Sequence, residues 1–199
     1  LTPESKTCDA ILQAWYPGQA GGTAIANVLF GDYNPAGRLP VTFYKSTNQL
    51  PDFEDYSMKG RTYRYMTEAP LFPFGHGLSY TTFQYGNASL NAPEIKDGEQ
   101  VTLTIPVSNT GKYDGEEVVQ VYLRRPGDKE GPSHALRAFK RVAIAKGTTN
   151  QVTIPLSKEN FEWFDTSTNT MRPIEGDYEI LYGGTSELKQ LKSIPVTIK

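Results

Sequence analysis

Two arginines and two tyrosines lie within five residues, at Arg61, Tyr63, Arg64 and Tyr65, and these residue types are well suited to bind a sugar. The planar face of a tyrosine can stack on a pyranose ring, and a guanidinium group donates forked hydrogen bonds. The same side chains also form aromatic and ion-pair locks between domains. They are therefore candidates for a substrate rim, and the alternative, an interdomain lock of aromatic side chains and salt bridges, is the one we favour.

The remaining residues that could do chemistry are sparse. His76 stands between two glycines and His134 is the only other histidine, so a metal site built from several histidines is excluded. For His76 we favour a hydrogen-bonded structural residue over a catalytic group. The acids Asp52, Glu54 and Asp55 lack the spacing of a calcium loop and indicate a solvated turn. We therefore expect no metal.

The composition sets wider limits. The 199 residues are 38% hydrophobic and 21% charged, which is typical of a folded protein. A formal net charge of −2 offers no basic excess for a nucleic acid partner, and no apolar run is long enough for a membrane span. The lone Cys8 cannot form an internal disulfide, and we expect a small buried residue there. Because the chain starts at Leu1 without a methionine or a signal peptide, we expect it to be cut from a longer one.

Residues 1–44 have an α/β pattern. The apolar run from Ala10 to Tyr16 is short and favours a buried strand. Apolar residues then recur every four positions from Ala20 to Val28, which predicts a helix that ends at Gly31. An extended segment follows from Leu39 to Phe43. These elements are too few to close their own sheet, so the segment must dock on something.

Residues 45–81 show no clear periodicity and indicate a long linker. Residues 82–199 alternate apolar and polar side chains in runs separated by turn residues, as in Val101 to Val107 and Val119 to Leu123. About seven such runs predict a fibronectin III-like or immunoglobulin-like β-sandwich. Pro106 and Pro155 should lie at sheet edges or at unpaired positions.

Two sequence blocks carry a specific resemblance. The first is YPGQAGGTAIANVLFGDYNPAGRLPVTF, from Tyr16 to Phe43, and the second is RTYRY, from Arg61 to Tyr65, followed by LFPFGHGLSY, from Leu71 to Tyr80. In order and spacing they resemble family 3 glycoside hydrolases, at the end of the α/β sandwich domain and its connection to a third domain. The resemblance implies a mainly β chain: the C-terminal remnant of an α/β sandwich domain (1–44), a linker (45–81) and a fibronectin III-like β-sandwich (82–199).

The resemblance also implies an activity. The parent protein would be a retaining, exo-acting β-glucosidase or β-xylosidase, whose two catalytic carboxyl groups stand about 5–5.5 Å apart. In the family the nucleophile is an Asp of a first barrel domain and the acid/base is a Glu upstream of the region where this chain starts. Neither motif is present, and Glu4 and Glu54 lack that context. We therefore expect no catalytic residue in this chain, no cofactor, and a structural, inactive fragment.

Further expectations concern the junction and the partners. Phe72, Phe74, His76 and Tyr80 are expected to pin the linker at a domain junction. The implied partners are the missing N-terminal domains and β-glycosides derived from oligo- or polysaccharides, and a homodimer stays open. For a bacterial-type parent, the resemblance favours a periplasmic or secreted location.

The alternative is a stand-alone carbohydrate-binding or interaction module. Such a module needs an exposed aromatic platform, for which the sequence offers Phe161, Trp163, Phe164 and Tyr178. The same residues suit core packing equally well. The glycine-rich helix segment of residues 16–43 favours a part of a larger enzyme, because a free-standing module has no use for it.

Overall fold

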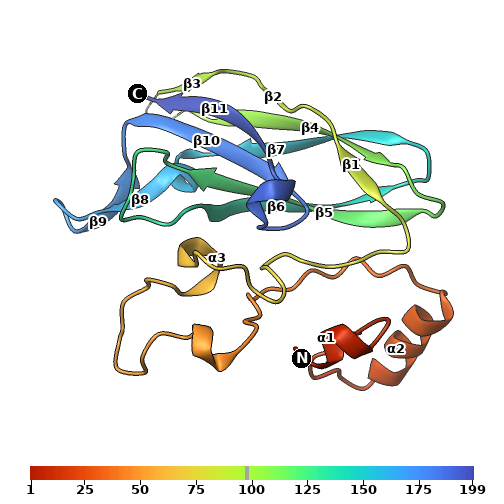
Figure 1. The fold of residues 1–199 in the computed structure, drawn as a ribbon. Helices are drawn as coiled ribbons and strands as arrows, with labels where there is room; N and C mark the ends of the chain where they lie inside the picture. The colour runs from red at the N-terminus through yellow and green to blue at the C-terminus, as the bar shows by residue number, and fades with distance from the viewer. Residues whose placement is uncertain (97–98) are drawn as a thin grey trace.

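The computed structural model describes residues 1–96 and 99–199. Two β-sheets stack from residue 83 onward, and residues 1–80 form an irregular layer with short helices along one side of them (Figure 1). The chain is therefore mainly β, as the sequence predicts.

The smaller sheet is built around one long central strand. Strand β4 (Val101–Asn109) pairs along one side with β7 (Thr149–Leu156). On its other side it pairs in turn with β1 (Phe83–Tyr85) and β2 (Ser89–Leu90). All of these pairings are antiparallel, which is the usual arrangement in such sandwiches.

The larger sheet has five strands in the order β3-β11-β10-β5-β6. Their bounds are β3 (Glu94–Ile95), β11 (Lys192–Ile198), β10 (Gly176–Gly183), β5 (Gly115–Arg124) and β6 (Ala135–Ile144). The pairing of β3 with β11 is parallel, and the others are antiparallel. The 3-10 helix η2 (Lys158–Phe161) leads into a separate hairpin of β8 (Glu162–Asp165) and β9 (Thr170–Pro173), and η3 (Leu188–Gln190) precedes β11.

Period-two patterning explains the core between the sheets. Val101, Leu103, Ile105 and Val107 of β4 are all fully buried, and the residues between them are half-buried. They meet Val119, Val121 and Leu123 of β5 and the inward residues of β7 and β10 in one hydrophobic cluster. Side chains two positions apart share a face of a strand, so this alternation places an apolar face on each sheet.

The two strand prolines lie where a missing N–H costs little. Pro155 is on β7, which pairs only with β4 among the described strands. Pro106 is on the central strand, opposite the break between β1 and β2, where its carbonyl accepts from the amide of Gly86 at 2.7 Å. Both placements agree with the prediction.

Residues 1–80 contain four short helices. They are α1 (Glu4–Thr7), α2 (Gly21–Phe30), the 3-10 helix η1 (Thr47–Gln49) and α3 (Thr62–Tyr65). Helix α2 confirms the predicted helix, and Gly31 ends it with a left-handed φ of 86°. Within the described residues, no helix is long and apolar enough to cross a membrane.

Two predictions for the first segment were wrong. Ala10 to Tyr16 forms no strand, and Trp15 and Tyr16 are exposed. A strand needs a neighbour for its backbone groups, and the described part of the chain offers this segment no sheet edge. Cys8 is exposed rather than buried. The expected extended segment from Leu39 to Phe43 pairs only through an isolated antiparallel bridge between Phe43 and Phe72.

Candidate functional site

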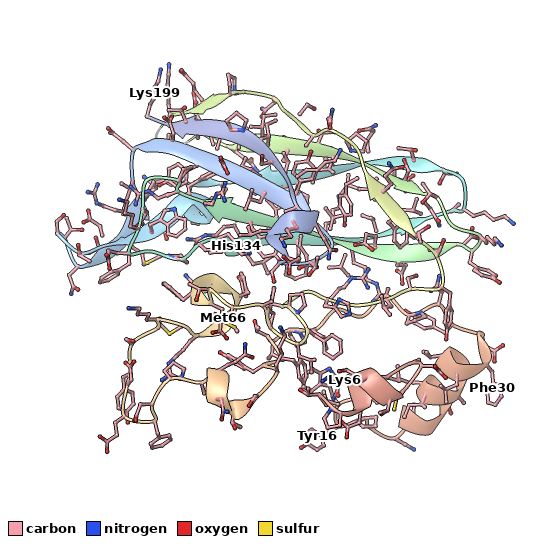
Figure 2. All side chains as sticks on the ribbon, in the orientation of Figure 1. Lys6, Tyr16, Phe30, Met66, His134 and Lys199 are labelled. Carbon is pink, nitrogen blue, oxygen red and sulfur yellow. The ribbon has the colours of Figure 1, made fainter. Side chains whose placement is uncertain are left out.

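The linker covers the outer face of the five-stranded sheet, and the contacts there form what we call the junction. Strand β5 is buried on both faces, because Gln120 and Tyr122 point away from the core and are still 3% and 0% exposed. Figure 2 shows His134 at the boundary between the sandwich and the linker, with Met66 of the linker beyond it. The sequence singled out the linker side of this contact, and the structure adds the sandwich side.

Tyr63 lies at the centre of the junction. Its ring stacks on Phe74, with the ring centroids 4.7 Å apart, and meets Tyr122 and His134 edge-on at 5.8 and 5.1 Å. Its hydroxyl accepts a hydrogen bond of 3.0 Å from the amide of Leu136 on β6. Burial raises the pKa of Tyr63. These contacts join the linker to the sandwich, and Phe74 occupies a ring face on which a sugar could otherwise stack.

The other rim candidates lie apart from Tyr63. Arg61 donates to the backbone carbonyls of Ser57 and Asp55 and so closes its own loop. Arg64 places its guanidinium carbon 5.7 Å from the ring centre of Tyr65, and both residues line a cavity beside the hairpin β8–β9. The four candidates therefore do not converge on one place.

His134 is a buried polar residue that fixes the linker from the sandwich side. It is 2% exposed, and its Nε2 lies 2.9 Å from the carbonyl oxygen of Ser186. Because a carbonyl only accepts, Nε2 carries the proton, and Nδ1 accepts from the hydroxyl of Ser133 at 2.7 Å. Burial lowers the pKa of His134 to about 4, so the imidazole is neutral at pH 7.

The Pro-Phe-Gly-His-Gly part of the family block clasps β5 and the loop after β10. The carbonyl of Phe74 accepts from the amide of Ser186 at 2.9 Å. The carbonyl of Gly75 accepts from Gln120 at 3.2 Å, and the same side-chain amide donates to Gly184 at 2.6 Å. Gly75 has a φ of 78°, and a Cβ added there would lie 2.1 Å from Oε1 of Gln120. Only glycine fits this close approach.

Phe72 and His76 face the first segment. Their rings stack with centroids 5.3 Å apart, and Phe72 also meets Phe43 edge-on at 6.4 Å. Backbone hydrogen bonds from Leu39 to His76 and from Phe43 to Phe72, both 2.9 Å, run alongside. Burial, followed by the charge of Arg38, lowers the pKa of His76.

Tyr80 and Asn34 join the end of the linker to helix α2. The hydroxyl of Tyr80 donates to the carbonyl of Val28 at 2.5 Å, and the backbone amide of Tyr80 donates to Asn34 at 2.8 Å. The side-chain amide of Asn34 in turn donates to the carbonyl of Asp114 at 2.9 Å, at the start of β5. One asparagine thus contacts all three parts of the chain.

A buried charge cluster at the edge of the junction was missed from the sequence. Arg38 and Glu117 form an ion pair of 2.5 Å with 10% and 3% of their side chains exposed, and Tyr85 donates to Glu117 at 2.8 Å. Burial raises the pKa of Glu117, while Arg38 and Tyr85 oppose that rise. The signal was present, because Glu117 is in phase with Val119 and Val121 and so is a charge at an inward position.

The remaining candidates have structural surroundings. Asp52 and Asp55 accept from the backbone amides of Glu54 and Ser57, as in ordinary turns, and no cluster of metal-binding side chains occurs in the described residues. In the proposed aromatic platform, Phe161, Trp163 and Tyr178 are buried in the core, and Phe164 is exposed. Three of the four aromatics are therefore core residues.

The fold and the junction together define the class of the protein. A fibronectin III-like sandwich is clasped along one side by residues of the first 80 positions. Residues 1–80 match the glycosyl hydrolase family 3 C-terminal domain, and residues 117–186 match the fibronectin type III-like domain. The chain belongs to glycoside hydrolase family 3 and corresponds to a C-terminal portion of its members.

Individual relatives agree with this assignment. A protein of Xylanibacter ruminicola named xylan 1,4-beta-xylosidase is 56% identical over the whole chain, and the periplasmic beta-glucosidase of Salmonella typhimurium is 38% identical over 83% of it. The chain spans 23% of the length of each. A solved β-glucosidase from Erythrobacter marinus superposes with a TM-score of 0.84 at 36% identity, and the match covers 98% of this chain and 26% of that one.

Proposed function

We propose that the chain is the C-terminal part of a retaining, exo-acting β-glycosidase that removes terminal β-linked sugars. Its own role in the enzyme is structural: it completes the α/β domain and braces it with the sandwich. The chain alone is inactive. The 56% identity to a protein named xylan 1,4-beta-xylosidase favours xylose over glucose.

The observation that carries the bracing role is the continuous set of contacts through the junction. Residues of the first segment bond directly to the sandwich, through the ion pair of Arg38 with Glu117 and the hydrogen bond of Asn34 to Asp114. The half-buried Tyr63 adds aromatic contacts from the linker. A segment held this firmly positions the rest of its domain against the sandwich. We therefore assign Tyr63 to the lock, and Arg61 to the closure of its own loop, rather than either of them to sugar contact.

The apolar residues left uncovered in the first segment support a larger enzyme. Leu29 and Phe30 of α2 are 66% and 84% exposed, and Tyr16 is fully exposed. Figure 2 shows Tyr16 and Phe30 on the outside of this segment, away from the sandwich. Large contiguous apolar surfaces mark sites of contact with other protein. We propose that the remainder of the enzyme covers them.

The carboxylates of the chain support the absence of catalysis. Glu4 and Glu54 are exposed, and Glu117 is committed to Arg38 and Tyr85. A retaining glycosidase needs a nucleophile and an acid/base about 5–5.5 Å apart around the scissile bond. We propose that both groups lie outside this chain, as the family resemblance implies.

The test compares this chain with its full-length parent on nitrophenyl β-xyloside and β-glucoside. We expect no turnover by the chain at any enzyme concentration and turnover by the parent, faster on the xyloside. Hydrolysis by the purified chain would overturn its assignment as a structural part. Failure of the parent on every β-glycoside would overturn the proposed activity.

The retaining mechanism has a separate test. A double displacement releases the β-anomer first, and proton magnetic resonance spectra recorded during the first minutes of hydrolysis distinguish it from the α-anomer. Initial release of the α-anomer by the parent would show inversion.

A further inference from the structure

A large cavity opens beside the junction, where α3 faces the end of the sandwich that carries β8 and β9 (Figure 1). Its volume is about 1080 Å³. Residues that line it include Arg64, Tyr65, Arg125, Arg137, Trp163 and Phe164. Cavities that bind small molecules are usually about 300–1,000 Å³, so this one has room for a sugar.

The walls of the cavity are fixed to one another. The carbonyl of Arg64 accepts from the amide of Ser133 at 2.7 Å, which ties α3 to the end of the loop after β5. Arg137 of β6 donates to the carbonyl of Glu162 at 2.6 Å, and its guanidinium carbon lies 4.9 Å from the ring centre of Trp163. The linker, β6 and the hairpin therefore form a built site rather than a gap between loose loops.

Hydrogen-bond donors without partners gather in these walls. Within the described residues, four buried side-chain polar atoms lack a partner, and three of them are in residues that line this cavity: Nε of Arg64, Nε of Arg137 and Nε1 of Trp163. No acceptor in the described structure bonds to the guanidinium of Arg64. Buried donors without acceptors are costly, so these walls hold unused donor capacity, and oxygen atoms that entered beside them would be stabilised there.

Three of the four acids that line the cavity are already engaged elsewhere. Asp128 accepts from Arg125 at 3.3 Å and from the amide of Gly131 at 2.8 Å. Asp177 accepts from Thr197 at 2.8 Å. The third acid, Asp165, pairs with Arg172 of the neighbouring strand.

Among the described residues, the guanidinium groups of Arg64 and Arg137 line the cavity without an ion-pair partner. Lys129 and Glu130 also line the cavity, but both are exposed, and they are neighbours of opposite sign. Burial and then the charge of Arg64 lower the pKa of Arg137, so the nearby cation disfavours the charged form of Arg137. An anion between them would relieve this repulsion.

We infer that this cavity binds a carboxylate-bearing sugar, such as a uronic acid. The arginines match a carboxylate, which they bind through paired charge-assisted hydrogen bonds. The half-buried Tyr65 and the exposed Phe164 and Met171 supply apolar surface for the sugar ring. The inference goes beyond the bracing role, because it assigns a ligand to a place that the junction contacts leave open.

The experiment titrates the 199-residue chain with sodium glucuronate, glucose and acetate and follows the indole N–H signals by ¹H–¹⁵N correlation spectroscopy. The chain has two tryptophans, Trp163 in the cavity wall and Trp15 in the first segment, which serves as an internal reference. We expect glucuronate to shift the Trp163 signal saturably, to leave the Trp15 signal in place, and to bind more tightly than glucose or acetate.

Two variants with the same change of charge distinguish binding in the cavity from a general effect of the protein's net charge. Arg64→Gln should weaken glucuronate binding about tenfold or more, because it removes a charge-assisted contact. Arg141→Gln is the control, since Arg141 lies on the same strand as Arg137, pairs with Glu116 and does not line the cavity. Its affinity should be unchanged. Circular dichroism of both variants checks that the fold is intact.

Each contrary result overturns a defined part of the inference. A glucose affinity equal to that for glucuronate would remove the role of the carboxylate. An acetate affinity equal to that for glucuronate would remove the role of the sugar ring. No shift at Trp163, or equal losses in both arginine variants, would remove the site.

Discussion

Tyr63 shows how a residue suited to bind a ligand can be used for packing instead. Its ring is engaged by one stacked contact with Phe74 and by two edge-type contacts with Tyr122 and His134. We expect Tyr63→Ala to lower the free energy of unfolding by about 3–5 kcal/mol, because it leaves a cavity at the junction. Tyr63→Phe should cost about 1–3 kcal/mol, because it leaves the amide of Leu136 without its acceptor.

Urea denaturation of both Tyr63 variants measures these losses. Tyr65→Phe is the matched control, since no hydrogen bond from the hydroxyl of Tyr65 occurs in the described structure. It should change the stability by less than about 0.5 kcal/mol. Equal stabilities of the Tyr63 and Tyr65 phenylalanine variants would contradict the lock.

His134 gives the junction a defined response to acid. Its pKa is about 4 in the folded state, against an ordinary value near 6.5. As the pH falls from about 6.5 to 4, the unfolded chain binds a proton that the folded chain does not, so stability is lost through this window. The loss is about 3 kcal/mol when complete. Above pH 6.5 this residue contributes no slope.

The acid response can be isolated by comparing the chain with its His134→Gln variant at pH 7 and pH 4.5. The stability difference between the two proteins should shrink or reverse as the pH falls, because only the unmutated chain takes up this proton on unfolding. Direct titration of the two imidazoles by magnetic resonance gives an independent value. A His134 pKa near 6.5 would contradict the buried, neutral state.

At the scale of elements, the effect of a side chain at Gly75 can be compared with its effect at Gly147, a glycine with a similar backbone conformation. Gly75 and Gly147 have φ values of 78° and 70°. A Cβ at Gly147 meets nothing within 4 Å, whereas a Cβ at Gly75 meets the side chain of Gln120. Gly147→Ala should therefore cost only the strain of the left-handed conformation, about 1–2 kcal/mol.

Gly75→Ala should cost clearly more than Gly147→Ala, because the same strain is joined by a clash with Gln120 and the loss of its hydrogen bonds. Thermal unfolding of the two variants compares them directly. A double variant, Gly75→Ala with Gln120→Ala, should recover the steric part of the loss. Equal costs at the two glycines would show that the linker does not clasp β5.

The elements differ in how far their sequence predicts them. Alternation in Val101 to Val107 and the stop at Gly31 are local signals, so strand β4 and helix α2 follow from the sequence. The run Ala10 to Tyr16 carries the pattern of a strand but forms none, because a strand needs a paired neighbour. The strands of the sandwich are predictable because they find their pairing partners within the chain, and the run from Ala10 to Tyr16 finds none.

The junction illustrates the limit for long-range contacts. The family block and Tyr63 were recognised in the sequence, but their partners Gln120, Tyr122 and His134 lie 45 or more residues away along the chain. Nothing local indicates which face of β5 the linker covers. Glu117 is the exception, since a carboxylate in phase with core residues calls for a buried cation, which is Arg38.

At the scale of the whole molecule, the two parts of the chain differ in how well they bury their apolar side chains. The sandwich encloses a single hydrophobic core. Among the described residues, fifteen of the twenty exposed large apolar side chains belong to residues 1–80. An apolar surface of this extent favours association with other protein, whether the rest of the proposed enzyme or a second copy of the chain.

This surface predicts the behaviour of the chain in solution. Tyr16, Phe30 and Phe53 are each more than four-fifths exposed. We expect the chain to self-associate with rising concentration, and the triple variant Tyr16→Ser, Phe30→Ser, Phe53→Ser to associate much less. Its free energy of unfolding should change by less than about 1.5 kcal/mol, because exposed side chains contribute little to stability. Sedimentation velocity measures the association.

A triple leucine variant at the same three positions is the control for this prediction. It changes the same residues but keeps their apolar surface, so it should associate like the unmutated chain. If the serine variant also associates like the unmutated chain, the surface of the first segment does not cause the association. The exposed Phe139 on β6 then becomes the next residue to replace. If only the serine variant is monomeric, the apolar surface of the first segment drives the association, as expected for a segment whose remaining contacts lie outside this chain.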